Sequence, residues 1–277
     1  MLKIDAHQHF WRFDPVRDSW IGPDMAVIQR DFMPTDLQPV LRASGIDGCV
    51  VVQSDSSEAE NEFHLDEAAG YDFVKGVVGW VDLQSRGIRD RLAWYKQFPK
   101  IKGFRHVLQG EKDRALMLKP AFKRGIGMLK EFGYTYDILI YPDQLGYAKE
   151  FVQAFPDQPF VIDHLAKPHI KDGQLKKEWE EAIRMVARQE NVYCKISGMV
   201  TEADWKNWKP ADFHPYLDTV VEAFGTRRLL YGSDWPVCLV AGSYASVLQI
   251  VQDYFAAYSK TEQEDLFGGN AIRFYNL

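Results

Sequence analysis

The sequence predicts a (β/α)8 TIM barrel of the α/β class, formed as one domain by residues 1–277. Eight short apolar runs alternate along the chain with longer stretches that have helical spacing. The length of 277 residues is close to the roughly 250 residues typical of such barrels. Hydrophobic residues make up 46% of the chain and charged residues 26%, so the chain can bury a large core.

Each expected strand is a short run of apolar and β-branched residues. Several runs are almost continuously apolar, as a parallel strand requires when helices cover its outer face, and strict alternation is absent. We therefore expect the strands to pair in parallel. The runs span residues 3–10, 48–55, 74–83, 101–108, 134–141, 159–164, 192–197 and 228–233.

The stretches between the strands carry helix start and stop signals. Thr35 and Asp36 precede an amphipathic stretch that ends at Gly45, and Ser56 opens another that ends at Gly70. Further helices are expected at residues 86–98, 114–132, 142–155, 175–189, 210–224, 243–258 and 261–267.

Alternation of this many strands with helices favours a closed barrel over an open doubly wound sheet, although periodicity alone leaves both open. No GxGxxG or Walker-type phosphate loop follows any expected strand. Two connections are unusually long, residues 11–35 after the first strand and 199–208 after the seventh. Connections of this kind lie on the catalytic face of a barrel, so we expect both to border the functional site.

The composition excludes several classes of partner. The formal net charge is −6 and no block of Lys or Arg occurs, which argues against nucleic acid and anionic membrane surfaces. No apolar stretch approaches the roughly 20 residues of a membrane span, and the first residues lack a signal-peptide pattern, so we expect a cytoplasmic protein. Cys49, Cys194 and Cys238 each lie in an apolar run and are expected to be reduced core residues.

His7 and His9 lie near the end of the first expected strand. Residues two apart in a strand point to the same side, so both imidazoles can face the barrel mouth and converge on one point. The alternative is one packed and one exposed histidine with no common role. The long loop that follows favours the functional interpretation.

Asp234 and His164 lie at the ends of two other strands. Because a barrel closes on itself, the last strand adjoins the first, and Asp234 can approach His7 and His9 across that seam. The alternative for Asp234 is an ordinary turn residue before a proline. His164 ends the sixth strand, where it can serve the site or bond a backbone group, and alternation predicts that Asp163 faces out of the barrel.

The fourth strand can turn either Arg105 or His106 inward, and Arg105 is the better candidate because a guanidinium binds carboxylates and polarised carbonyls in a fork. Other candidates are weighed equally between lining the pocket and structural pairing or packing. They are Gln53, Asp137, Lys195 and Trp235, together with Trp11, Trp20, Trp205 and Trp208. Three histidines in helical or loop stretches are expected on the surface: His64, His169 and His214.

Four motifs together resemble the amidohydrolase-related family 2 of the amidohydrolase superfamily. They are His-Gln-His at residues 7–9, Asp-His-Leu-Ala-Lys-Pro at 163–168, Tyr-Gly-Ser-Asp-Trp-Pro at 231–236 and the terminal stretch 267–275. The chain is most similar to the sugar-lactonase branch, the L-fuconolactonase and L-rhamnonolactonase group, which is related to 2-pyrone-4,6-dicarboxylate lactonase. The similarity covers residues 3–275 and implies a barrel hydrolase that acts on a small-molecule substrate.

The metal sites of the family are only partly matched. Metal-dependent members generally carry a His on strand five and often a Lys or Glu on strand four, and neither is found here. We therefore expect no binuclear site. His7, His9, His164 and Asp234 could hold one divalent ion such as zinc, but the resemblance to the lactonase branch implies that no cofactor is required.

The predicted reaction is hydrolysis of a sugar-acid lactone, in which Asp234 is the general base on the attacking water. His7, His9 and His164 would bind the carbonyl or the water, and Arg105 would stabilise the oxyanion or the product carboxylate. One rival is a mononuclear zinc hydrolase or nonoxidative decarboxylase of the same family. Another is a barrel that only binds a sugar acid.

Overall fold

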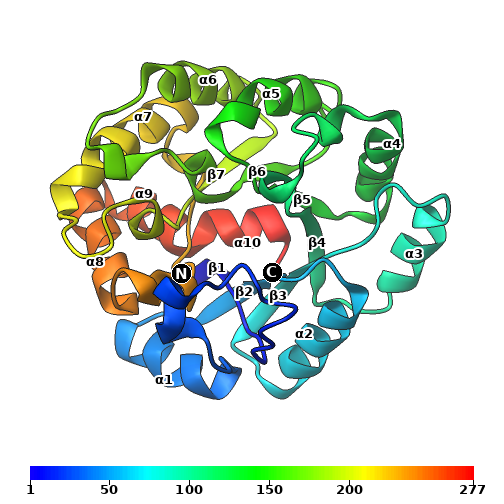
Figure 1. Cartoon of the computed structure of the whole chain (residues 1–277), viewed down its shortest axis with the longest axis horizontal. Coiled ribbons are helices and arrows are strands. Elements are labelled where there is room, and N and C mark those ends of the chain that lie inside the picture. The colour runs from blue at the N-terminus through cyan, green and yellow to red at the C-terminus, as the bar shows by residue number, and fades with distance from the viewer.

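The computed structural model describes residues 1–277 as eight parallel strands inside a ring of helices (Figure 1). The strands follow one another around the sheet in chain order. They are β1 (Ile4–Gln8), β2 (Gly48–Val52), β3 (Val74–Gly79), β4 (Ile101–His106), β5 (Thr135–Ile138), β6 (Phe160–Ile162), β7 (Val192–Ile196) and β8 (Leu229–Tyr231). Each lies within an expected run, so the predicted barrel fold is confirmed.

The sheet closes between its first and last strands. A parallel bridge joins Gln8 to Trp235, the amide of His9 donates to the carbonyl of Trp235 at 2.7 Å, and the amide of Asp234 donates to the carbonyl of His7 at 2.8 Å. These bonds lie beyond the end of β8, at the carboxyl ends of the strands. The closure therefore brings the His-Gln-His segment and Asp234 together at one rim.

Ten helices accompany the strands, and most of them form the outer layer. They are α1 (Pro34–Ser44), α2 (Glu58–Gly70), α3 (Ile88–Tyr95), α4 (Pro120–Leu129), α5 (Leu145–Gln153), α6 (Lys177–Ala187), α7 (His214–Phe224), α8 (Tyr244–Phe255), α9 (Lys260–Glu264) and α10 (Asn270–Tyr275). The expected helix at 114–132 begins only at Pro120, because proline is suited to the first turn of a helix and disrupts its interior. Helix α10 was not predicted, since it is short and follows a π turn at Asp265–Gly269.

Two apolar cores hold the fold together. The larger one lies between the strands and the helices and contains 66 buried residues. The smaller one contains 10 buried residues, most of them from the strand faces opposite the helices, with Ala271, Phe274 and Tyr275 from α10. Helix α10 crosses the centre of the ring in Figure 1. It therefore packs against one end of the barrel interior, where burying each large apolar side chain stabilises the fold by about 1.5–3 kcal/mol.

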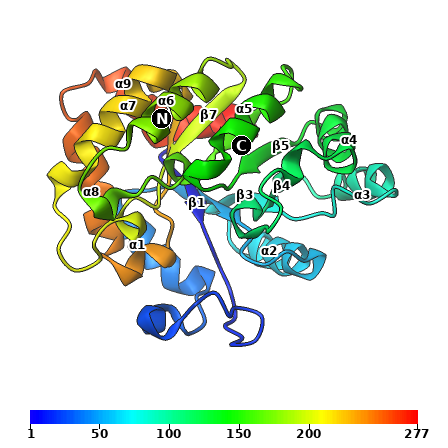
Figure 2. The ribbon, with the colours of Figure 1, turned by 45° about the horizontal axis from the view of Figure 1, so that its top comes forward.

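The long segment after β1 projects beyond the ring of helices (Figure 2). Its two ends are joined by backbone hydrogen bonds between Trp11 and Phe32, and the indole of Trp11 donates to the carbonyl of Arg30 at 2.9 Å. None of the helices is long and apolar enough to cross a bilayer. The three cysteines are buried and free, as predicted.

The prediction of a surface position for His64 is wrong. The side chain is fully buried on α2, and its Nε2 donates to the carbonyl of Phe10 at 3.1 Å. That carbonyl lies where the chain leaves β1 and has no strand partner, so a buried donor from the adjacent helix satisfies it. His169 and His214 are exposed.

Candidate active site

A β-bulge in β1 turns His7 into the barrel. The pairing of β1 with β2 shifts register between Asp5 and Gln8, so Ala6 lies in the interior core while Gln8 points outward to the thiol of Cys49. His7 and His9 then face the same point, with 3.3 Å between their Nε2 atoms. The convergence of the two imidazoles is as predicted, although simple alternation from Ala6 would have turned His7 outward.

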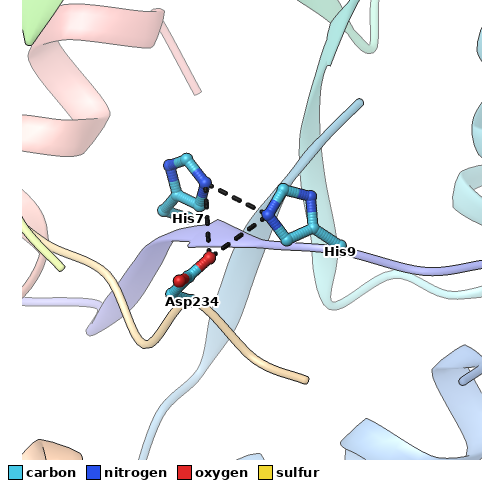
Figure 3. A group of neighbouring side chains, drawn as sticks. All are labelled: His7, His9 and Asp234. Carbon is cyan, nitrogen blue, oxygen red and sulfur yellow. Dashed lines mark hydrogen bonds and ion pairs between the residues drawn. The ribbon is translucent and has the colours of Figure 1, made fainter. Parts of the chain in front are cut away.

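Asp234 completes this group from the segment after β8 (Figure 3). Its Oδ1 lies 3.3 Å from Nε2 of His9 and 3.8 Å from Nε2 of His7. The backbone of Asp234 has a φ of 57°, a left-handed conformation that is uncommon outside glycine, Asn and Asp. Asp5 supports both sides of the seam, because its buried carboxylate accepts the amides of His7 at 3.1 Å and Ser233 at 2.9 Å.

His164 reaches the same carboxylate from a left-handed turn. Residues 164–167 have φ values of 53°, 54°, 56° and 50°, and the turn is closed by a 2.7 Å bond from the amide of Lys167 to the carbonyl of His164. Such a conformation costs about 1–2 kcal/mol for each non-glycine residue, so the surrounding fold must impose it. His164 Nε2 lies 3.9 Å from Asp234 Oδ1, and Nδ1 lies 2.9 Å from the hydroxyl of Ser197.

The prediction that Asp163 faces out of the barrel is wrong. Strand β6 ends at Ile162, and the turn that follows breaks the alternation on which the prediction depended. Asp163 is fully buried, with one carboxylate oxygen 3.3 Å from His7 Nδ1 and the other accepting from Arg105 Nη1 at 3.0 Å. It therefore links the first strand to the fourth inside the barrel.

Arg105 faces the interior and His106 faces outward. His106 lies on the helical side, 2.7 Å from Glu111 and in edge contact with Phe122 of α4. Besides Asp163, Arg105 donates to both the side-chain oxygen and the backbone carbonyl of Gln53. The guanidinium is thus held by the residues that directly follow β2 and β6.

A buried lysine lies beneath His7. Lys195 Nζ is 3.1 Å from His7 Nδ1, 3.0 Å from Asp163 Oδ1 and 2.5 Å from Asp137 Oδ2, and all four side chains are fully buried. The hydroxyl of Tyr275 on α10 donates to the same Asp137 oxygen at 2.8 Å. Sequence reasoning missed Tyr275 and Asp5. The only sequence feature that points to Tyr275 is the terminal motif 267–275, and that motif does not predict where the tyrosine lies in the fold.

The site opens into a cavity of about 350 Å³ at the carboxyl ends of the strands. Its lining residues are His9, Trp20, Ser54, Arg105, Val107, Gln109, Gly110, Leu139, Tyr141, His164, Lys167, Asp234 and Val237. Gln53, Asp137, Lys195 and Trp235 do not line it. The first three lie in the buried layer just described, and Trp235 packs edge-on against Phe10 and Phe32.

Burial and charge set the protonation of the cluster. Burial, with help from Lys195, lowers the pKa of His7 well below its usual value, and burial lowers the pKa of His164 to about 4. Although burial alone would raise it, the neighbouring His164, His9 and His7 hold the pKa of Asp234 below its usual value. At neutral pH an ionised carboxylate therefore faces neutral imidazoles of His7 and His164.

The donor set at this point fits one divalent metal ion. His9 Nδ1 lies 2.7 Å from the carbonyl of Val52, which can only accept, so Nδ1 carries a hydrogen and the ring is fixed with Nε2 toward Asp234. When Nε2 carries no proton, its lone pair and the Asp234 carboxylate are two ligands that can bind one cation. The separations of 3.3, 3.3 and 3.8 Å among the three ligand atoms are close to the ~3.3 Å edge of a tetrahedron with zinc-ligand bonds of about 2.0–2.1 Å.

A second group of potential ligands is already neutralised. His7, Asp163 and His164 also lie within reach of a common point, but Asp163 is paired with Arg105 and Lys195. The described residues therefore offer one metal position, formed by His7, His9 and Asp234, with His164 beside it.

Known proteins resemble this chain over its full length. The Amidohydro_2 family model, described as amidohydrolase, matches residues 4–277. An L-fucono-1,5-lactonase of Burkholderia multivorans is 37% identical, covering 100% of this chain and 96% of that protein. Crystal structures of an amidohydrolase from the same organism, one with bound HEPES and one with bound zinc, superpose with a TM-score of 0.96 at 37% identity and cover 100% of both chains.

Proposed function

The chain belongs to the Amidohydro_2 family of amidohydrolases, and on this premise we propose that it is a lactonase, a hydrolase that opens the ester bond of a sugar-acid lactone. The observation that carries the proposal is the convergence of Asp234, His9, His164 and Arg105 on one small cavity with an aromatic wall. A neutral, hydroxylated ring suits such a mixture of donors, acceptors and aromatic faces. The full-length L-fucono-1,5-lactonase relative supports the same substrate class.

Asp234 acts as the general base. Its Oδ1 takes a proton from a water molecule as the water oxygen bonds to the lactone carbonyl carbon. The carbonyl electrons move to the oxygen, which becomes an oxyanion. When the oxyanion collapses, the bond to the ring oxygen breaks, and the proton held by Asp234 passes to that oxygen to give a hydroxyl and a carboxylic acid.

His9 and His164 flank the base, and Arg105 lines the same cavity. His9 is oriented by the carbonyl of Val52, and His164 is oriented by Ser197, so both rings are fixed before substrate binds. Arg105 supplies the positive charge that stabilises the oxyanion and then the product carboxylate. Gln53, Asp163, Lys195 and Asp137 hold His7 and Arg105 in place from below.

A zinc ion would be held by His7, His9 and Asp234, with His164 beside it, and it would supply Lewis-acid polarisation of the carbonyl or the water. The prediction that activity does not require this ion, made from the resemblance to the lactonase branch, remains part of the proposal. Ester hydrolysis needs a base and an oxyanion site, and the protein side chains offer both.

A pH-indicator assay of a panel of sugar-acid lactones tests the function. Purified protein, with and without chelator treatment verified by metal analysis, should accelerate the opening of at least one lactone well above its spontaneous rate. If chelation abolishes the activity, the zinc-dependent alternative is correct. If no lactone is opened in either state, the lactonase proposal fails. In that case, CO2 release from hydroxybenzoates would reveal a decarboxylase, and sugar-acid binding without turnover would reveal a binding protein.

A further inference from the structure

The wall of the cavity contains one charged residue that the reaction does not use. Arg105 and Asp234 are 3% and 4% exposed and form the base of the cavity. Lys167 lies nearer the mouth, where 18% of its side chain is exposed. Its neighbours on the wall are neutral: Trp20, Ser54, Val107, Gln109, Gly110, Leu139, Tyr141 and Val237.

The left-handed turn fixes Lys167 relative to the reaction centre. Of the four residues in the turn, Leu165 and Ala166 are fully buried in the core, whereas His164 and Lys167 both line the cavity. The turn is held from outside by Trp179 of α6, whose indole donates to the carbonyl of Leu165 at 2.9 Å. The backbone of Lys167 is therefore held at a constant position relative to His164, which faces Asp234.

The ammonium of Lys167 is paired with a carboxylate that does not line the cavity. Its Nζ lies 3.3 Å from a carboxylate oxygen of Glu202 and 5.8 Å from the ring centre of Tyr141. Glu202 comes from the connection after β7 and does not line the cavity. An ammonium has three donors, so the pairing with Glu202 leaves donors free for a ligand while it balances the charge.

We propose that Lys167 determines specificity by binding the ring hydroxyls of the lactone, on the side remote from the reacting carbonyl. The inference rests on the proposed function, because it names the part of the sugar lactone that the cavity wall recognises. Since Glu202 balances the charge of Lys167, the wall suits a neutral polyol, and a lactone with extra carboxylates would lack a free cation at this position.

The first test compares two lactones that differ in hydroxyl groups. For Lys167→Met, kcat/KM for a hydroxylated 1,5-lactone of an aldonic acid should fall by about tenfold or more, mainly through KM, because a hydrogen bond to a charged donor is lost. The rate for δ-valerolactone, which has no hydroxyl groups, should change less than about twofold. The matched control is Lys177→Met, whose side chain on the outer face of α6 is 82% exposed, and it should change neither rate.

Equal losses on both lactones would show that Lys167 only maintains the structure, and no loss on either would show that it does not bind substrate. Both results overturn the proposal. The melting temperature of each variant should stay close to that of the wild type.

The second test uses Glu202→Gln and calorimetric binding of the sugar-acid anion. Removal of the counter-charge leaves one uncompensated positive charge on the cavity wall, so the variant should attract the anion and bind it about three- to tenfold more tightly, whereas Lys167→Met loses the hydrogen bond to the hydroxyls and should bind it more weakly. If Glu202→Gln binds the sugar-acid anion no more tightly than the wild type does, Glu202 does not balance the charge of Lys167, and the inference is contradicted.

The two tests separate the inference from the proposed function. Turnover of sugar lactones without any effect of Lys167→Met overturns the inference alone. Sugar-acid binding that depends on Lys167, without turnover of any lactone by the wild type, supports the inference and overturns the proposed function. Absence of both turnover and binding overturns both.

Discussion

The interior of the barrel has two halves of opposite character. Around α10 it contains apolar side chains, with Ile4, Val50 and Phe274 among them. At the carboxyl ends of the same strands it contains a layer of charged and polar groups in which Asp163 and Lys195 are fully buried. Strands β1, β2, β6 and β8 contribute to the apolar half and lead, a few residues further along, into the charged half, whereas Arg105, Asp137 and Lys195 come from β4, β5 and β7.

Stability and chemistry are located in different halves of the barrel. Apolar packing stabilises the fold wherever it is complete, but a buried ion pair contributes little net stability because desolvation offsets the attraction between the charges. The charged layer is therefore better explained by what it positions, which is His7, Arg105 and Asp234. Substitutions in the two halves should separate activity from stability.

The largest effect is expected for Asp234→Asn at the rim of the charged half. The amide cannot take a proton from water, so kcat/KM for the best lactone should fall by about 10³-fold. Because the pKa of Asp234 is held below its usual value, the ionised carboxylate stabilises the folded state at neutral pH, and its loss should lower the free energy of unfolding by about 1 kcal/mol. Initial rates and urea unfolding measure the two quantities. A rate within a few-fold of the wild type would mean that Asp234 is not the base.

The opposite pattern is expected for Phe274→Ala in the apolar half. The cavity left in the interior core should lower the free energy of unfolding by about 3–5 kcal/mol, while kcat of the folded fraction stays near the wild-type value. Urea unfolding and active-site-normalised rates test this. If kcat falls as much as stability does, the two halves are not independent.

Tyr275 lies at the boundary between the halves, because it belongs to α10 but bonds Asp137. Tyr275→Phe removes the hydroxyl that bonds Asp137 and should lower kcat by about tenfold, because side chains that position reacting groups typically have effects of this size. The lost hydrogen bond should lower the free energy of unfolding by about 1 kcal/mol. The matched control is Tyr136→Phe, since the Tyr136 hydroxyl is buried without a hydrogen-bond partner. Equal effects of the two changes on kcat would remove Tyr275 from the positioning network.

The smallest effect is a pH dependence of stability from Asp137. Burial raises the pKa of this carboxyl from 3.8 to about 6, because the opposing effect of Lys195 is smaller and the negative charge of Asp163 adds to the rise. The folded state then holds the proton more tightly than the unfolded state. The resulting stabilisation is complete below about pH 4 and is lost as pH rises through 6.

Asp137→Asn cannot titrate at this position. The wild type should therefore lose stability relative to the variant, on the order of 1 kcal/mol, as pH is raised from 4 to 6. Thermal unfolding of both proteins at several pH values measures the difference. If the difference in stability between the wild type and the variant stays constant or changes in the opposite direction, Asp137 is ionised over the whole range from pH 4 to 6.

Sequence reasoning succeeded where local pattern and barrel closure decide the outcome. The apolar runs defined the strands, and closure alone places Asp234 beside His9, which the structure has at 3.3 Å. Reasoning failed where the backbone leaves the regular pattern. Regular alternation predicts that Asp163 faces out of the barrel, but the chain forms a left-handed turn at 164–167. The residue types in that turn ordinarily avoid the left-handed conformation, so the sequence gives no sign of it.

Long-range contacts of side chains were the other gap. Tyr275 is 138 residues from Asp137 in the chain, and nothing local indicates that a short terminal helix reaches the barrel interior. Lys167 was visible only as part of a motif. Its place on the cavity wall depends on the same turn.

The central claim is that water attacks the carbonyl carbon of a sugar-acid lactone in this cavity. Hydrolysis in ¹⁸O-labelled water, followed by mass spectrometry of the product, tests it most directly. We expect the protein to accelerate ring opening and to place one ¹⁸O atom in the new carboxylate, with none in the released ring hydroxyl. Label in that hydroxyl, or no acceleration over the protein-free reaction, would contradict it.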